Sequence, residues 1–220
     1  MIAHELKNPV MSIKGLATTA TRLYDSMSDE ERLEFFKLID SEASRMKLIA
    51  DETSTALKID AGLLAYDIRP EDFGKLVETA AWGAPIGEHA IVVEVEEGFT
   101  APVDRARVGE IVLHLIDNAV KFSPPDSPIE VRAYRGEDGD AVLEVADRGP
   151  GVVAERREEI FDRYARWRPP GYEETPGAGL GLFICRAHAQ AHGGRIDVVD
   201  EPERGTMLRV VLPGGAERGS

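Results

Sequence analysis

The sequence has one cysteine, Cys185, and no apolar run long enough to span a membrane. A single cysteine cannot form an intramolecular disulfide or a multi-cysteine zinc site, and it is typical of a reducing compartment. The N-terminus also lacks a basic-then-apolar signal pattern. We therefore expect a cytoplasmic chain without membrane contact. We also expect it to be part of a longer protein, and a membrane-bound parent is compatible with the sequence.

Basic residues are few, because 26 Lys and Arg stand against 40 Asp and Glu, for a formal net charge of −14. This charge repels phosphate backbones, so we expect no nucleic-acid partner. The hydrophobic share of 43% and the charged share of 30% are typical of a folded globular protein. A chain of 220 residues can form two domains, each with its own core.

The N-terminal quarter has helical periodicity in two segments. Apolar residues recur every three or four positions over residues 6–24 and again over residues 33–57. Ser28 and Glu31 have the spacing of a capping box, and Gly62 ends the second segment. The short loop predicts an antiparallel hairpin, which buries too little apolar area to be stable alone. We therefore expect a homodimer in which two hairpins form a four-helix bundle.

Beyond the hairpin the periodicity becomes mixed, which predicts two domains, residues 1–62 and residues 63–220. The second domain has the α/β pattern. Residues 152–178 show no sustained strand pattern, and connections of this length are commonly active-site lids. The predicted strands lie near 91–95, 129–131, 142–144 and 208–210, and the predicted helices near 72–82, 105–121 and 180–192.

The first helix opens with the segment His-Glu-Leu-Lys-Asn-Pro at residues 4–9. His4 lies off the apolar stripe, so its imidazole can face solvent as a nitrogen nucleophile. Asn8 lies one turn away on the same face. Pro9 cannot donate to the carbonyl of Glu5, so we expect the helix to bend here. A structural role is the alternative for a lone helical histidine. No motif includes His89, His188, His192 or Cys185, which we expect to be structural or solvated.

A second polar group lies on the helix predicted over residues 105–121. His114, Asn118 and Lys121 share one face of it. This pattern can be a solvated surface. It can also bring the amide oxygen of Asn118 to a magnesium ion and the ammonium of Lys121 to phosphate oxygens.

Two glycine-rich segments complete the set. Asp-Arg-Gly-Pro-Gly at residues 147–151 follows an apolar strand and is a common turn, but Asp147 could also accept the amino hydrogens of adenine. Gly-Ala-Gly-Leu-Gly at residues 177–181 opens a helix, and its spacing differs from that of a dinucleotide-binding fingerprint. Glycine-rich backbone at a helix N-terminus can still bind phosphate.

In this order the four segments resemble the H, N, G1 and G2 boxes of sensor histidine kinases. Residues 160–166 resemble the F box of that family, and residues 205–213 resemble its last strand. The resemblance implies a dimerisation and histidine-phosphotransfer hairpin, followed by an α/β-sandwich ATP-binding domain of the gyrase, chaperone and histidine-kinase superfamily. It also implies that the protein autophosphorylates and passes the phosphoryl group to an aspartate of a response regulator receiver domain.

The resemblance also implies a role for each site residue. His4 is the phosphoacceptor, Glu5 orients or deprotonates it, and Asn8 positions water when the partner is dephosphorylated. Asn118 would bind Mg²⁺. Other residues would form the ATP pocket and its lid: His114, Lys121 and Arg166 near the phosphates, Asp147 at adenine, and Phe122, Gly149, Gly151, Gly177, Gly179, Leu180 and Gly181 around them.

The chain departs from the family at His114, where an asparagine usually stands, and Phe122 replaces a frequent tyrosine. His114 can be a second magnesium ligand or can only form hydrogen bonds. Two other functions are compatible with parts of the pattern. A degenerate kinase would act as a dimeric scaffold for a response regulator. A superfamily ATPase or serine kinase would lack the hairpin with its His-Glu-x-x-Asn-Pro segment, which this chain has.

Overall fold

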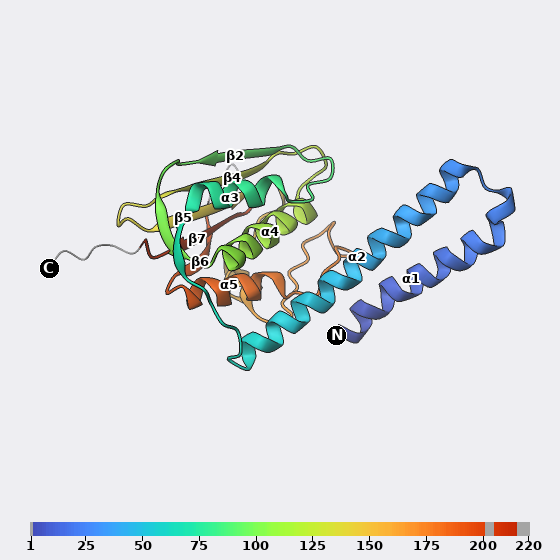
Figure 1. Ribbon diagram of the computed structural model, residues 1–220, viewed down its shortest axis with the longest axis horizontal. Coiled ribbons are helices and arrows are strands. Elements are labelled where there is room, and N and C mark those ends of the chain that lie inside the picture. The colour runs from blue at the N-terminus through green and yellow to red at the C-terminus, as the bar shows by residue number, and fades with distance from the viewer. Residues whose placement is uncertain (1, 201–204, 215–220) are drawn as a thin grey trace. The chain divides into compact units, whose positions relative to one another are not determined.

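Figure 1 shows the computed structural model, which describes residues 2–200 and 205–214, and of residues 2–4 the backbone alone. The chain divides into two compact units, Met1–Gly62 and Leu63–Ser220. Within the described residues, no helix is both long and apolar enough to cross a membrane.

The first unit is a hairpin of two long helices, α1 (Ile2–Leu23) and α2 (Asp29–Asp60), joined through a short 3₁₀ turn, η1 (Tyr24–Ser26). The predicted capping box is confirmed. The Ser28 hydroxyl accepts from the amide of Glu31 at 3.2 Å, and the Glu31 carboxylate accepts from the amide of Ser28 at 2.7 Å. Arg32 donates to the Tyr24 carbonyl at 2.8 Å, so the loop is tied to the start of α2.

The second unit has one sheet with helices on one face (Figure 1). Its five strands have the order β2-β4-β5-β7-β6; β2 and β4 are parallel, and β4–β5, β5–β7 and β6–β7 are antiparallel. A separate two-stranded ribbon pairs β1 with β3. The elements are β1 (Arg69–Asp72), α3 (Phe73–Trp82), β2 (Ile91–Val95), β3 (Thr100–Val103), α4 (Arg105–Phe122), β4 (Ile129–Arg135), β5 (Ala141–Ala146), η2 (Ala154–Arg156), η3 (Glu159–Phe161), α5 (Gly181–Ala191), β6 (Arg195–Val199) and β7 (Met207–Leu212).

This arrangement confirms the expected α/β sandwich. The core lies between the helices and the sheet, where Ile111 and Leu115 of α4 and Leu143 of β5 are fully buried. The opposite face of the sheet is polar. There Glu144 accepts from Arg209 at 2.6 Å and from the Tyr134 hydroxyl at 3.0 Å. The alternation of apolar and polar residues along these strands reflects these two environments. Strands β1, β3 and β6 were not predicted.

Candidate functional site

Asp147 lies immediately after β5 in a buried position. Its Oδ1 atom accepts from the amides of Gly149 at 2.7 Å and Thr206 at 3.0 Å. Its own amide donates to the Thr206 carbonyl at 2.9 Å. Burial raises the pKa of Asp147, although the hydrogen bonds from Gly149 and Thr206 act in the opposite direction. The carboxylate is thus held in one orientation and, with four lone-pair positions, can still accept from a ligand.

The backbone next to Asp147 is packed too closely for side chains. A Cβ on Gly149 would stand 2.4 Å from the carbonyl oxygen of Phe122, the last residue of α4. A Cβ on Gly205 would stand 2.6 Å from Oδ1 of Asp147. Gly151 has a φ of 74°, which favours glycine. The predicted G1 segment therefore lies against the end of α4, and Gly205 lies beside it.

The last turns of α4 carry the predicted phosphate and metal residues. Asn118 is half-buried, and Lys121 forms an ion pair with Asp117 one turn earlier. The Lys121 Nζ lies 4.0 Å from the point where a Cβ on Gly177 would stand. The ring centroid of Phe122 lies 5.8 Å from that of Tyr172 in the long loop. The end of α4 thus faces the loop that precedes α5.

His114 lies on α4 one turn before Asn118, and its side chain is buried. Burial lowers the pKa of His114, although the nearby carboxylates of Glu110 and Asp117 act to raise it. We therefore expect a neutral imidazole at neutral pH.

The glycine-rich segment before α5 packs closely against the predicted F box and is hydrogen-bonded to it. Gly177 has a φ of 149° and Gly179 one of 70°, and a Cβ on Gly179 would stand 2.4 Å from the Ala165 carbonyl oxygen. Tyr164, itself at a φ of 65°, donates its amide to the Gly179 carbonyl at 2.8 Å. A non-glycine residue in this conformation is strained. Such strain is common at ligand sites.

The remaining predicted ATP residues lie close by in sequence. Leu180 is fully buried and is the N-cap of α5 without a side-chain cap, and Gly181 begins the helix. The amides at this end of α5 are a favourable position for an anion. Arg166 is half-buried in the loop between η3 and α5.

The predicted phosphoacceptor residues belong to the other unit. The backbone of His4 lies in the first turn of α1, and its side chain falls outside the described residues. Glu5 is buried, Asn8 is exposed, and Pro9 lies inside the helix. The expected bend at Pro9 stays a prediction.

Three residues that contribute to the site were not identified from the sequence. Thr206 holds Asp147, Asp117 pairs with Lys121, and Tyr172 packs on Phe122. A signal existed for Asp117, because an acidic residue four positions before a lysine on a helix predicts an ion pair. The long separation in sequence hid the other two.

Two family models match the chain. Residues 103–216 match "Histidine kinase-, DNA gyrase B-, and HSP90-like ATPase", and residues 1–62 match "His Kinase A (phospho-acceptor) domain". The sensor protein KdpD of Clostridium acetobutylicum is 28% identical over 96% of this chain and 24% of its own length. The histidine-protein kinase/phosphatase MprB of Mycobacterium tuberculosis is 31% identical over 96% of this chain and 43% of its own. The chain thus spans less than half the length of these curated relatives.

A solved structure shows the same fold. Acinetobacter baumannii histidine kinase AdeS superposes with a TM-score of 0.70 at 18% identity, covering 97% of this chain and 98% of that one. The long helical hairpin, the one-layer sheet with its helices and the two family models agree. The chain therefore belongs to the sensor histidine kinases, and it carries both their phospho-acceptor domain and their ATPase-type domain.

Proposed function

We propose that this chain moves the γ-phosphoryl group of ATP to His4 and then to an aspartate of a response regulator receiver domain. The observation that carries the proposal is the close packing in the second unit of Asp147, the Phe122 end of α4 and the glycines beside them. This packing holds a carboxylate acceptor next to the end of α4, where a base with an amino group can donate to it.

Adenine recognition falls to Asp147 in this proposal. Its carboxylate is fixed through Oδ1 by the amides of Gly149 and Thr206. The exocyclic amino group of adenine is a donor, and a held carboxylate is an acceptor that needs no reorganisation to receive it. The lack of a side chain at Gly149 lets the Phe122 carbonyl pack against it, which keeps the end of α4 beside Asp147.

The phosphates would lie between the end of α4 and the start of α5. Lys121 and Arg166 would bind phosphate oxygens, with Gly177, Gly179 and Gly181 providing backbone room around them. Asn118, with its amide oxygen, and His114, with its neutral nitrogen, are the proposed ligands of Mg²⁺. A bound Mg²⁺ would neutralise charge on the transferring phosphoryl group. Lys121 must leave Asp117 in part to reach the phosphate, and both lie on one turn of α4.

The acceptor in this proposal is a ring nitrogen of His4. A nitrogen–phosphorus bond forms as the bond between the γ-phosphorus and the β,γ-bridging oxygen breaks, and ADP leaves. Glu5, the next residue, orients the imidazole and accepts its other N–H proton. Asn8 lies one turn from His4 and would position a water molecule when the receiver domain is dephosphorylated.

Dimerisation through the hairpin is part of the proposal. In a single chain, Leu33, Phe36, Met46 and Leu57 of α2 stay exposed, with 61% of Phe36 accessible. These residues belong to the helical stripe that the sequence predicts, and a second hairpin would cover them. We also propose a cytoplasmic location for this part of the protein.

The test is incubation with γ-³²P-ATP. Wild type should yield a phosphoprotein that is stable to alkali and labile to acid, and His4→Ala should yield none while binding ATP with unchanged affinity. His89→Ala is the matched control, because His89 belongs to the second unit, where its ring hydrogen-bonds with the Ser127 carbonyl at 3.0 Å. Alkali-stable label on His4→Ala would refute the acceptor. A dimer that binds a receiver domain but never takes up label would instead be a scaffold.

A further inference from the structure

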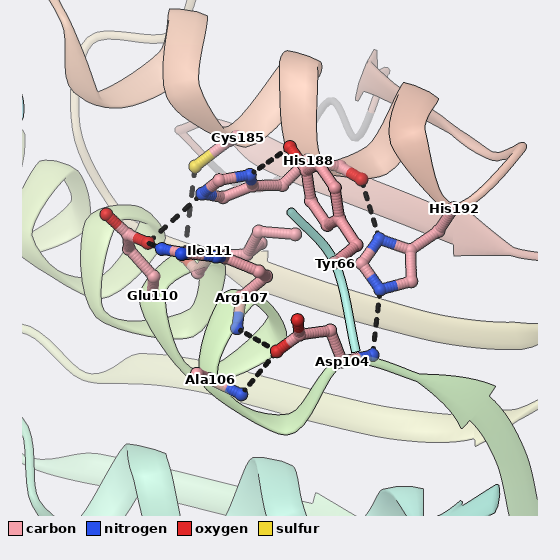
Figure 2. A network of polar contacts seen from close by, with 9 residues as sticks. All are labelled: Tyr66, Asp104, Ala106, Arg107, Glu110, Ile111, Cys185, His188 and His192. Atoms are coloured by element: carbon pink, nitrogen blue, oxygen red, sulfur yellow. Dashed lines mark hydrogen bonds and ion pairs between the residues drawn. The ribbon is translucent and has the colours of Figure 1, made fainter. Parts of the chain in front are cut away.

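Tyr66 lies in the segment with which the second unit begins, just after the hairpin, and it is bonded to α5 within that unit (Figure 2). Its hydroxyl lies 2.9 Å from Nδ1 of His188 on α5. Its ring also packs edge-on against His188 and His192, each with a centroid distance of 5.7 Å. His188 is fully buried, so this hydrogen bond is shielded from water.

The contact continues from α5 to α4. The Nε2 of His188 lies 3.1 Å from a carboxylate oxygen of Glu110, which also accepts from Arg107 at 3.0 Å. An ionised carboxylate only accepts, so Nε2 carries a proton. In a neutral imidazole, Nδ1 then accepts from the Tyr66 hydroxyl. While the imidazole is neutral, the order of donation is Tyr66 to His188 to Glu110.

A second connection starts at the next residue. The amide of Asp67 donates to Oδ2 of Asp104 at 2.8 Å, and Oδ1 of the same carboxylate caps α4 by accepting from Ala106 and Arg107. The amide of Asp104 donates to Nε2 of His192 at 2.9 Å. Figure 2 shows Asp104 and His192 together with Tyr66, between the start of α4 and the second half of α5.

These same two helices carry proposed ATP residues at their other ends, and His114 of α4 lies one turn after Glu110. Helix α4 begins beside Asp104 and reaches Asn118 and Lys121 more than three turns later. Helix α5 begins at Gly181 and reaches His188 two turns later. The hydrogen bonds of Tyr66 and Asp67 thus reach the two helices at His188 and Asp104, which are not among the proposed ATP residues.

We propose that Tyr66, His188 and Glu110 form a latch that fixes the exit of the hairpin on the ATP-binding unit, and that Tyr66 and His188 are positioning residues for phosphoryl transfer between the two units. The inference rests on the proposed function, since it concerns the step in which ATP on one unit meets His4 on the other. Transfer requires the reacting atoms to be held within a narrow geometry. A loose exit segment lets the hairpin sample more orientations, so the transfer rate falls while ATP affinity does not.

The test is Tyr66→Phe, which removes the hydroxyl and keeps the ring packed on the two histidines. The matched control is Tyr134→Phe, which loses a hydroxyl bonded to Glu144 on the polar face of the sheet. For a hydrogen bond of ordinary strength, we expect kcat for autophosphorylation to fall about three- to tenfold in Tyr66→Phe. The Kd for ATP, measured by calorimetry, should stay within about twofold, and Tyr134→Phe should match wild type in both.

Hydrogen exchange gives a second measurement that does not depend on activity. In Tyr66→Phe, amides of residues 63–68 should exchange faster, including that of Asp67, while those of β4 and β5 stay protected. Unchanged exchange and kcat would overturn the latch, and an equal loss of kcat and ATP affinity would overturn a role in transfer. Wild type that forms no phosphohistidine would refute the proposed function instead, and the exchange result would then report on the latch alone.

Discussion

Asp147 and Thr206 are 59 residues apart in sequence, yet the amide of Thr206 donates to Oδ1 of Asp147 at 3.0 Å. The bond fixes the carboxylate of Asp147. Burial raises the pKa of this carboxyl group, although the hydrogen bonds from Thr206 and Gly149 act to lower it. A raised pKa means that the folded state holds the proton more tightly than the unfolded state, so stability falls as pH rises through it. The ionised side chain therefore destabilises the fold at neutral pH.

Asp147→Asn tests two effects separately: the destabilisation caused by the buried charge and the proposed contact with adenine. The amide keeps an acceptor for Gly149 and Thr206 and removes the buried charge, so the free energy of unfolding at pH 7 should stay equal or rise by about 1 kcal/mol. The Kd for ATP should rise at least about tenfold, because an amide NH₂ would then face the amino group of adenine. Urea unfolding and titration calorimetry measure the two. A large loss of stability would mean that the carboxylate is structural.

Gly179→Ala tests the close approach of the glycine-rich segment to the F box. Its Cβ would stand 2.4 Å from the Ala165 carbonyl oxygen at a φ of 70°. We expect ATP affinity to fall at least about tenfold, since the loop must move to relieve the clash. Gly171→Ala is the control: Gly171 has a φ of 90° in the same loop, but nothing lies within 4 Å of its Cβ position. Equal effects of the two variants would point to backbone strain alone.

Glu110→Gln should make stability less dependent on pH. Burial alone would raise the pKa of Glu110, but the hydrogen bond and charge of His188 and the bond from Arg107 lower it from 4.5 to about 2. A lowered pKa stabilises the fold above 4.5, and this contribution disappears as pH falls toward 2. Because Glu110 is partly exposed, we expect only part of this contribution. The free energy of unfolding of wild type should exceed that of the variant by about 2 kcal/mol at pH 7, and by less at pH 3.5.

Urea unfolding between pH 3.5 and pH 7 measures this difference for Glu110→Gln. The control is Glu94→Gln, whose ion pair with Arg132 at 2.9 Å is largely exposed. Exposed ion pairs contribute little to stability. The free energy of unfolding of Glu94→Gln should therefore be close to that of wild type at every pH. A gap for Glu110→Gln that stays constant with pH would contradict the lowered pKa.

His114→Asn tests the position at which the chain departs from its family. A neutral imidazole is a softer ligand than a carboxamide oxygen, and Mg²⁺ prefers hard oxygen donors. If His114 contacts the ion, wild type should have a larger Mn²⁺-over-Mg²⁺ rate advantage in autophosphorylation than the variant has. Initial rates at saturating ATP with each metal measure this ratio. The same ratio in both proteins would show that His114 only forms hydrogen bonds.

Phe36→Glu tests the dimer. A charge at an interface of apolar helices would have to be buried, so the variant should be monomeric at concentrations where wild type is dimeric. Sedimentation velocity measures the change. Trp82→Glu is the control, because Trp82 has the same exposed fraction, 61%, but lies at the end of α3 in the other unit. A monomeric wild type, or two dimeric variants, would exclude this face of α2.

Sequence patterns predicted those elements whose two faces differ. Strands β2 and β4 alternate in burial because one side packs on helices, whereas β5 and β7 are buried almost throughout and carry one ion pair, Glu144 with Arg209. The ribbon strand β1 reads Arg-Pro-Glu-Asp and has no apolar face, so its pairing with β3 is a tertiary effect. Strand β6 is short and bears charges at Arg195 and Asp197.

The site was predictable where residue type and spacing determine chemistry. Asp147, Asn118 and the glycine-rich segments could be named in this way, and their roles stay predictions. Contacts between residues that are distant in sequence could not be predicted in this way. His188 has no motif, and its partner Tyr66 is 122 residues earlier, so only the folded chain shows that an expected structural histidine joins two helices to the hairpin exit.

The last strand in sequence is central in the sheet. Strand β7 pairs with β5 on one side and β6 on the other, so β5 has only β4 beside it, and β6 has no paired strand, until residues 207–212 have been synthesised. A nascent chain that stops earlier leaves an open edge on β5, next to the loop that holds Asp147, and unpaired edges invite association with other chains. Synthesis through residue 212 is thus required before the sheet of the second unit is complete.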